Sequence, residues 1–360
     1  MIPAVPHVLA MSPYALAQLD APAGKRVISL SQNESLRPPS PLAIDAAAKA
    51  LAGAHLYPDP DWRDLRMALS QQHDIPADRI LCGCGSMELI GGLTRAYADA
   101  QNAVLAPAHA YPFFNTAAQS AHARFDTAPE QGTHVCVDAL LAAVRPDTRL
   151  VFIANPGNPT GTRIPRSDLI RLRAGLPGDT LLVIDEAYGE FADHLSEPMF
   201  DLAARGDTVV LRTFSKAYGL AGMRVGWGLF PPEIATQIRK VTNPNNVTAA
   251  AQAGALAALL DQPYMRETCD LTIAHRDRFR HRLLGAGFDV PESFTNFVLI
   301  RMANAEAAQR ADAALRKNGV VLRPQGGVGL DQCLRATIGP ESDLDLVAAC
   351  LEHWAQEDRQ

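Results

Sequence analysis

Three polar residues stand out because each one follows a short apolar run. Asn158 lies in a turn sequence dense in Asn, Pro and Gly, Asp185 comes directly after four apolar residues, and Lys216 follows a third apolar run. Taken one at a time, each has an ordinary structural explanation: an Asn that forms a turn, an Asp that caps a helix, and a Lys that is solvated. Taken together, they offer an amide, a carboxylic acid and an amine at three successive points of the chain.

One cofactor needs this combination of groups. Pyridoxal 5'-phosphate (PLP) forms an imine with a lysine amine, requires an acid that keeps its pyridine nitrogen protonated, and requires hydrogen-bond donors for its phenolic oxygen. Lys216 would supply the amine, Asp185 the acid and Asn158 a donor. The joint occurrence of the three residues therefore predicts a PLP enzyme, which no one of them predicts alone.

The elements that must position these groups are short buried strands. Between about residues 60 and 230, apolar runs of four to six residues alternate with helix-length stretches, which is typical of an α/β fold with a mainly parallel sheet. We expect strands at residues 79–82, 103–106, 150–154, 181–184, 208–211 and 225–229. Because ligands bind where the strands of such a sheet end, the three polar groups should meet at one edge.

A glycine-rich turn, Gly83-Cys84-Gly85-Ser86-Met87-Glu88, follows the first of these strands and precedes a helix. We expect Ser86 to be the N-cap of this helix, and the free N–H groups of the first helical turn could hold a phosphate. A dinucleotide-binding motif is excluded, because Glu88 replaces the third glycine and the next strand is not followed by an acidic residue. A plain strand-to-helix turn would also account for the glycines.

The last third of the chain has a different pattern. Alanine-rich helical sequence at 247–284 is followed by short apolar runs and further helical stretches. We expect strands at residues 297–301, 320–323 and 334–338, and a final helix from about Glu341. This mixture predicts a smaller α+β unit.

The length of the chain predicts more than one domain, because 360 residues exceed the size at which single cores usually split. The first residues are rich in Pro and too irregular to fold alone, so we expect them to pack as an arm on the smaller unit. We therefore predict an N-terminal arm at 1–45, a large PLP-binding domain at 46–245 and a small C-terminal domain at 246–360.

Composition narrows the class of protein. The net charge of −6 and the absence of a dense Lys/Arg run argue against nucleic acid as a partner. The sequence contains no stretch of roughly 18 uninterrupted apolar residues, so we expect no membrane span, and the first residues do not resemble a secretory signal. The six cysteines show no metal-ligand spacing, so we expect no metal, reduced thiols and a cytoplasmic protein.

With these motifs, the chain resembles the fold-type I PLP-dependent aminotransferases of class I/II, and most closely the histidinol-phosphate aminotransferase family. The resemblance is carried, in chain order, by Ser12–Tyr14, Asn33-Glu34, Tyr57–Pro60, Asn155–Gly161, Val183–Tyr188, Thr213–Arg224 and Leu334–Gly339. It implies an aspartate-aminotransferase-like α/β fold, with a mainly parallel seven-stranded sheet in the large domain and a smaller α+β C-terminal domain.

The resemblance also implies roles around the cofactor ring. Lys216 would form the aldimine with PLP and carry the proton between the substrate Cα and the cofactor. Asp185 would pair with the pyridine nitrogen, Asn158 and Tyr188 would hydrogen-bond the phenolic oxygen, and Tyr111 would stack on the ring. Lys216, Asp185 and Tyr188 are thus the expected catalytic residues.

The phosphate site implied by the resemblance draws on several segments. Its expected ligands are Gly85, Ser86 and Met87 of the glycine-rich turn, with Thr213, Ser215 and Arg224. Tyr57 would reach the phosphate from a neighbouring subunit, so the resemblance implies a homodimer.

Substrate residues follow from the same resemblance. Arg335 would clamp a carboxylate in bidentate fashion, and Asn33 would contact the substrate. Arg323 matches the arginine that the family uses for the phosphate of histidinol phosphate, and Tyr14 matches an aromatic of the same pocket. The implied reaction moves an amino group from histidinol phosphate or an aromatic amino acid to a 2-oxo acid such as 2-oxoglutarate, by a ping-pong mechanism.

Two departures from the family pattern bear on this. Asn245 and Asn246 occupy a place where the family commonly has an aromatic residue followed by Asn, which we expect to change the substrate pocket. Met87 replaces the usual Asp of the phosphate-binding turn, which should matter less because the backbone makes that contact.

Two other classes remain as alternatives. One is a PLP-dependent decarboxylase or lyase related to threonine-phosphate decarboxylase, since the sequence does not show which Cα bond lies perpendicular to the ring. The other is a PLP-fold sensing module of a transcription regulator, which we expect to be excluded by the intact catalytic set and the lack of a DNA-binding extension.

Overall fold

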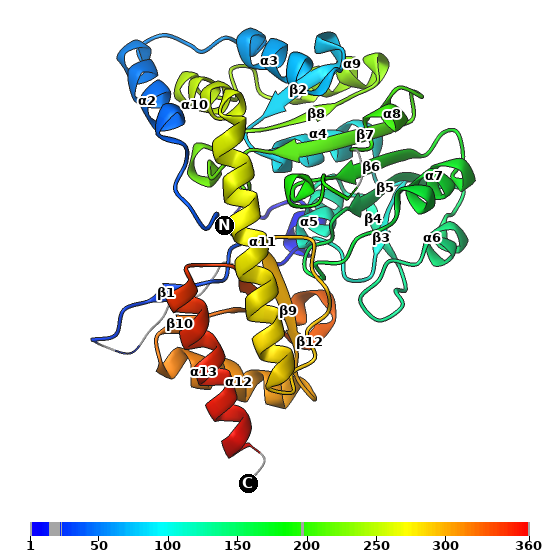
Figure 1. The fold of residues 1–360 in the computed structure, drawn as a ribbon. Helices are drawn as coiled ribbons and strands as arrows, with labels where there is room; N and C mark the ends of the chain where they lie inside the picture. Colours follow the sequence, from blue (N-terminus) through cyan, green and yellow to red (C-terminus); the bar gives the residue numbers. More distant parts are fainter. Residues whose placement is uncertain (1, 14–21, 23, 196–197, 359–360) are drawn as a thin grey trace.

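The computed structural model describes residues 2–13, 22, 24–195 and 198–358. The chain forms a larger unit, which holds the main sheet, and a smaller unit, which holds the C-terminus (Figure 1). A long helix, α11 (Gln262–Gly285), runs from one to the other. None of the helices in the described ranges is long and apolar enough to cross a membrane.

The larger unit is built on a seven-stranded sheet with the strand order β2-β8-β7-β6-β5-β3-β4. Only β8 runs antiparallel to its neighbours among these strands. In chain order the strands are β2 (Ile80–Gly83), β3 (Ala103–Pro107), β4 (Arg124–Ala128), β5 (Thr148–Ala154), β6 (Leu181–Asp185), β7 (Thr208–Thr213) and β8 (Gly226–Leu229). The predicted mainly parallel, seven-stranded sheet is therefore confirmed.

The strand that the apolar runs missed is β4. It lies at the edge of the sheet, beside β3, and only its last residue, Ala128, is buried. An edge strand with partly exposed side chains does not show the continuous apolar run of a central strand, whereas the central strands β6 and β7 are buried throughout.

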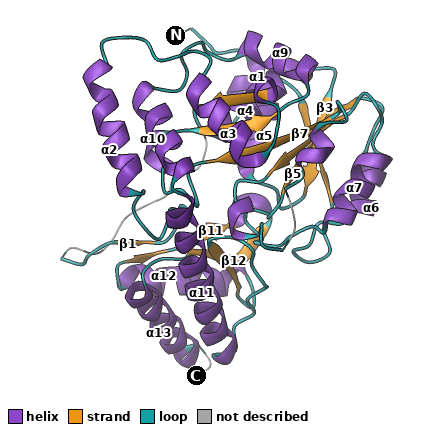
Figure 2. Ribbon diagram, turned by 45° about the horizontal axis from the view of Figure 1, so that its top comes forward, coloured by secondary structure: helices purple, strands orange, loops and turns teal. Residues whose placement is uncertain are grey.

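Helices surround this sheet (Figures 1 and 2). They are α3 (Arg63–His73), α4 (Ser86–Tyr97), α5 (Pro112–Ser120), α6 (Val137–Ala143), α7 (Arg166–Gly175), α8 (Phe200–Ala203) and α9 (Pro232–Val241). Helix α4 packs against α5 and α9, and α6 packs against α7. Pro at the first turn of α5 and α9 suits the helix start, where the missing N–H has no partner to lose.

The smaller unit contains a three-stranded antiparallel sheet with the order β11-β12-β9 and a two-stranded parallel pair, β1 and β10. The elements are β1 (Ile28–Ser29), β9 (Phe297–Arg301), α12 (Ala305–Lys317), β10 (Val320–Val321), β11 (Arg323–Gln325), β12 (Leu330–Thr337) and α13 (Glu341–Glu357). The strand expected at 320–323 is thus two strands, which belong to different sheets. A separate hydrophobic core fills this unit.

The helices that follow β8 divide between the two cores. Helix α10 (Ala249–Leu260) packs on α2 (Pro41–Ala50), and the buried residues of α10 and of α11 as far as Cys269 belong to the larger core. Phe279 and Leu283, further along α11, belong to the smaller core. We therefore propose that the domain boundary lies inside α11, further along the chain than the expected position at 246.

The N-terminal residues contact both units. The short helix α1 (Pro6–Leu9) packs against α5, where His7 stacks on His122 with 4.5 Å between ring centroids. Strand β1 pairs with β10 of the smaller unit, and α2 packs on the larger unit. The expected arm therefore bridges the two units and does not pack on the smaller one alone.

Candidate active site

The ends of β5, β6 and β7 meet at one edge of the sheet. Asp185, the last residue of β6, lies opposite Ala154 of β5 and Leu211 of β7 in the strand register. Asn158 follows β5 and Lys216 follows β7, so the three groups predicted from the sequence converge at this edge.

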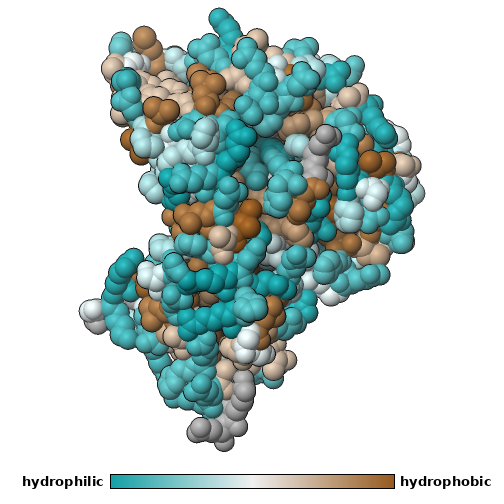
Figure 3. Space-filling model, viewed as in Figure 1, coloured by the Kyte–Doolittle hydropathy of each residue, from teal (hydrophilic) through white to brown (hydrophobic). Residues whose placement is uncertain are grey.

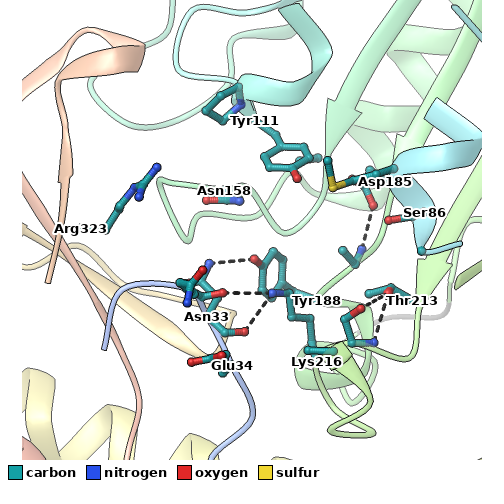
Figure 4. A pocket seen from close by; sticks show the side chains of 18 of the residues that line it. Asn33, Glu34, Ser86, Tyr111, Asn158, Asp185, Tyr188, Thr213, Lys216 and Arg323 are labelled. Carbon is teal, nitrogen blue, oxygen red and sulfur yellow. Dashed lines mark hydrogen bonds between the residues drawn. The ribbon is translucent and has the colours of Figure 1, made fainter. Parts of the chain in front are cut away.

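A cavity of about 560 Å³ opens there, between the two units (Figure 4). Of the residues predicted for the site, all but two line it: Asn33, Gly85, Ser86, Met87, Tyr111, Asn158, Asp185, Tyr188, Thr213, Ser215, Lys216, Arg224, Arg323 and Arg335. Tyr57 does not line the cavity, and its side chain is 88% exposed. Tyr14 lies outside the described residues.

The Lys216 amine is held at the cavity by backbone oxygens. Its Nζ donates hydrogen bonds to the backbone oxygen of Asn33 at 2.9 Å and to that of Gln32 at 3.4 Å. It also lies 5.7 Å from the centroid of the Tyr188 ring. Among the described residues, the acceptors of this amine therefore come from the N-terminal segment, 183 and 184 positions away along the chain.

Burial, together with the positive charges of Arg335 and Arg224, lowers the pKa of the Lys216 amine to about 8. The carboxylate of Glu34 opposes this shift. At pH 7 an amine with this pKa is neutral in about a tenth of the molecules, far more often than an ordinary lysine, and the neutral amine is the form that attacks a carbonyl carbon.

Asp185 is 4% exposed and lines the cavity. Its Oδ1 accepts a hydrogen bond from the Ala187 N–H at 3.1 Å. Burial raises the pKa of this carboxyl to about 7, and the negative charge of Glu186 adds to the shift. A buried acid of this kind gains most from a cationic partner, because a neighbouring positive charge restores its ionised form.

The segment after β6 is fixed by a buried guanidinium. Arg212 donates to Glu186 at 2.8 and 3.0 Å and to Asp193 at 2.8 Å, and it pairs with Glu190 at 3.3 Å. A Cβ at Gly189 would collide with this guanidinium. The chain that carries Asp185 and Tyr188 is therefore anchored from behind the cavity.

An anion-binding cradle lies at the start of α4. The helix begins at Ser86 and its N-cap is Gly85, so the expectation that Ser86 caps the helix is wrong by one position. The Ser86 and Met87 N–H groups have no acceptor within the described chain, since the first N–H groups of a helix lack intrahelical partners. Such groups bind anions.

Arg224, Thr213 and Ser215 complete the cradle. Arg224 has a left-handed backbone conformation with a φ of 56°, and its guanidinium lies where a Cβ of Gly85 would be. A Cβ at Gly226 would collide with the Ser86 backbone nitrogen. Gly85 and Gly226 thus leave room for the Arg224 guanidinium and the N–H groups at the start of α4 to lie close to the same site.

Two arginines enter the cavity from the smaller unit. Arg323 of β11 and Arg335 of β12 are direct neighbours in the antiparallel register. Arg335 donates to Asn158 Oδ1 at 2.6 Å and to the Ser31 backbone oxygen at 2.8 Å. Asn33 donates to the Tyr188 hydroxyl at 2.8 Å, so the N-terminal segment, the sheet edge and the smaller unit are joined around the cavity.

Two findings change the set of residues derived from the sequence. Glu34 lines the cavity but was not among the site residues predicted from the sequence. Its position directly after Asn33 and its charge are the signals that could have identified it. Asn245 and Asn246 do not line the cavity, so it gives no support to the expected change of the substrate pocket, which stays a prediction. The Asn246 amide instead bonds Trp62 and Glu88, outside the cavity. No metal-binding cluster of His, Cys, Asp or Glu occurs among the described residues.

Comparison with known families decides the class. The family model for "Aminotransferase class I and II" matches residues 25–351. The chain belongs to this family. Its members' cofactor and reaction class therefore apply to the cavity, and the predictions of a PLP-dependent aminotransferase and of the fold type are confirmed.

Individual relatives agree with this assignment. This aminotransferase is 41% identical to histidinol-phosphate aminotransferase of Paramagnetospirillum magneticum and 39% identical to that of Rhodospirillum centenum, over 97% of each chain in both cases. Its fold superposes on the crystal structure of Sinorhizobium meliloti histidinol-phosphate aminotransferase in complex with PLP, with a TM-score of 0.92, 31% identity, and 98% and 97% of the two chains covered. Aspartate aminotransferase of Thermus thermophilus, at 20% identity and a TM-score of 0.85 over 98% and 100% of the chains, shares the fold.

The cavity of this aminotransferase fits PLP by its own chemistry. The anion-binding cradle suits the phosphate, and the amine of Lys216 has the lowered pKa that imine formation needs. The raised pKa of the buried acid Asp185 would be lowered again by a protonated pyridine nitrogen beside it. The decarboxylase and regulator alternatives gain no support from these relatives, each of which is named an aminotransferase.

Proposed function

We propose that this aminotransferase transfers the amino group of histidinol phosphate to a 2-oxo acid such as 2-oxoglutarate, in two half-reactions that share one site. The observation that most directly supports this proposal is the cross-strand pair Arg323 and Arg335, which brings two guanidinium groups to the cavity from the smaller unit. A substrate with an anionic phosphate matches such a pair, because guanidinium groups bind phosphate and carboxylate through paired hydrogen bonds.

Each residue has a proposed part in this reaction. Bound PLP supplies an electron sink for the charge left on the substrate carbon when its proton departs. Lys216 anchors the cofactor and then moves that proton, since its amine has a pKa of about 8 and the residue lines the cavity. Asp185 holds the proton on the pyridine nitrogen.

The remaining cofactor contacts are proposals of the same kind. Asn158 and Tyr188 bond the phenolic oxygen, and Tyr111, whose ring faces the cavity, covers the cofactor ring. The cradle of Gly85, Ser86, Met87, Thr213, Ser215 and Arg224 holds the phosphate.

On the substrate side, Arg335 binds the carboxylate of the 2-oxo acid, and it is already oriented by Asn158 and by the Ser31 backbone. Arg323 binds the phosphate of histidinol phosphate. Asn33 contacts the substrate in this proposal, which its hydrogen bonds to Tyr188 and to the Lys216 amine support.

We also propose a homodimer. Exposed apolar side chains gather on residues 42–57, and Figure 3 shows hydrophobic surface around α2. They are Leu42, Ile44, Leu51, Leu56 and Tyr57. An exposed apolar patch of this kind marks an interaction surface, and a second copy covering it would allow Tyr57 to reach the phosphate cradle of its partner. A cytoplasmic location stays a prediction.

The proposed amino donor is tested by separate half-reactions of the Arg323→Ala variant. With PLP bound, conversion of the cofactor absorbance is followed with histidinol phosphate, phenylalanine, tyrosine or glutamate as the only donor. The variant should lose about 100-fold in kcat/KM with histidinol phosphate, the cost of a lost charged hydrogen-bond pair, and less than threefold with glutamate.

The matched control is Arg63→Ala, which removes an exposed arginine outside the cavity. It should leave kcat/KM unchanged with both histidinol phosphate and glutamate. Wild-type enzyme that reacts faster with phenylalanine or tyrosine than with histidinol phosphate would contradict the proposed donor while leaving the aminotransferase class intact. An equal loss with every donor would contradict the role given to Arg323.

A further inference from the structure

The phosphate-binding turn is held from outside the cavity by a carboxylate. Glu88 is the third residue of α4, and its Oε2 accepts a hydrogen bond from the Cys84 N–H at 2.6 Å. This bond resembles a capping box, in which the third helical residue reaches back to the turn before the helix. It satisfies the Cys84 N–H and leaves the Ser86 and Met87 N–H groups for a ligand.

Asn246 orients this carboxylate. Its Nδ2 donates to Glu88 Oε2 at 2.6 Å and to the Cys82 backbone oxygen at 3.2 Å. Its Oδ1 accepts from Trp62 Nε1 at 3.1 Å. Both ends of the amide are therefore used, and the side chain has one orientation that satisfies all its partners.

Trp62 connects this chain of bonds to the segment that carries Tyr57. The ring is buried, its backbone has a φ of 48°, and the Arg239 guanidinium lies 5.2 Å from its centroid. The preceding residue, Asp61, pairs with Arg66 at 2.6 Å and with Arg239 at 2.7 Å. Residues 57–62 are thus joined by side chains to the start of α4.

We propose that Trp62, Asn246 and Glu88 are positioning residues for the cofactor phosphate. Through them, the 57–62 segment determines the direction in which the N–H groups at the start of α4 point. None of the three touches the cavity. Their effect is on the conformation of residues 83–87, since the two glycines of this turn leave its backbone conformationally free unless outside contacts hold it. The inference depends on PLP and not on the identity of the amino donor.

The test compares two ligands that differ only in the phosphate. Cofactor-free enzyme is titrated with PLP and with pyridoxal, and binding to Lys216 is followed by absorbance. Glu88→Ala and Asn246→Ala should each weaken PLP about tenfold, the effect of losing roughly one well-made hydrogen bond in the cradle, and should change the affinity for pyridoxal less than twofold.

Two substitutions separate geometry from charge. Glu88→Gln should restore PLP affinity to within about threefold of wild type, because one amide oxygen can accept both bonds that Glu88 Oε2 accepts. Trp62→Phe, which keeps the ring and removes the Nε1–H, should weaken PLP by about threefold and leave pyridoxal unchanged.

The matched control is Asn245→Gly, next to Asn246, where a φ of 57° already suits glycine. It should bind both ligands as wild type does. Equal weakening of PLP and pyridoxal in Glu88→Ala, or unchanged PLP binding in both Glu88→Ala and Asn246→Ala, would overturn the proposal. Failure of histidinol phosphate as a donor would leave it standing.

Discussion

At the scale of the residue, the cavity holds an acid and a base whose pKa values are drawn toward each other. The pKa of Asp185 is raised to about 7 and that of Lys216 is lowered to about 8, in both cases chiefly by burial. Burial disfavours the charged form of each group. The cofactor-free enzyme therefore keeps ionisable groups in a place where their charge is costly until a ligand compensates it.

The pH dependence of stability tests this for Asp185. Because its pKa is raised from 3.8 to about 7, the folded state binds the proton more tightly than the unfolded state. The carboxyl thus contributes stability below about pH 4 and loses that contribution as the pH rises to 7. In cofactor-free enzyme, Asp185→Asn should raise the free energy of unfolding at pH 8 by roughly 1–3 kcal/mol, with no gain near pH 4.

Denaturant unfolding at the two pH values measures this difference, and absorbance titration measures PLP binding in the same samples. The variant should bind PLP more weakly, since an amide offers no negative charge to a protonated pyridine nitrogen. Asp277→Asn, at an exposed carboxylate, is the control. A gain in stability that is equal at pH 4 and pH 8 would contradict the assignment.

At the scale of the element, the cradle depends on how closely β8 approaches the start of α4. Strand β8 is the antiparallel member of the sheet, between β2 and β7, and its first residue is Gly226. A side chain at this position would displace either the turn before α4 or the backbone of β7, because a Cβ there also lies close to the Arg212 backbone oxygen.

Gly226→Ala should therefore weaken PLP at least tenfold, because the phosphate N–H groups lose their alignment. Gly178→Ala, at a glycine that does not line the cavity and where an added Cβ meets nothing within 4 Å, should bind PLP as wild type does. Absorbance titration of both cofactor-free variants checks this, and wild-type affinity in Gly226→Ala would show that the cradle tolerates a shift of the strand.

At the scale of the whole molecule, the proposed dimer face and the phosphate cradle should be coupled. Leu42→Asp places a charge on the exposed apolar face at 42–57, and it should convert the dimer to a monomer at micromolar concentration. If Tyr57 of a second copy contacts the phosphate, the monomer should also release PLP about tenfold faster.

Light scattering measures the oligomeric state, and the decay of the cofactor absorbance on dilution measures release. The control is Leu346→Asp, an exposed leucine of α13 on the smaller unit, which should leave both unchanged. A wild-type monomer, or a Leu42→Asp monomer that keeps PLP as the wild type does, would contradict the coupling of the two sites.

The sequence by itself determined the cofactor chemistry and the class of fold. Asp185 ends a buried strand, and Asn158 and Lys216 each follow one within a few residues. The apolar runs and the residues after them therefore predict the order of the strands and of their ends. The edge strand β4 is the exception, because its partly exposed residues do not form an apolar run.

Only the tertiary structure decided which distant segments complete the site. The bonds from Lys216 to Asn33, from Arg335 to Asn158 and from Asn246 to Glu88 each join residues more than a hundred and fifty positions apart. Such contacts depend on the path of the whole chain and leave no periodic pattern in the sequence. For the same reason, the assignment of α10 to the larger core and of Asn246 to the phosphate turn emerged from packing, where side chains from separate segments satisfy one another's hydrogen bonds.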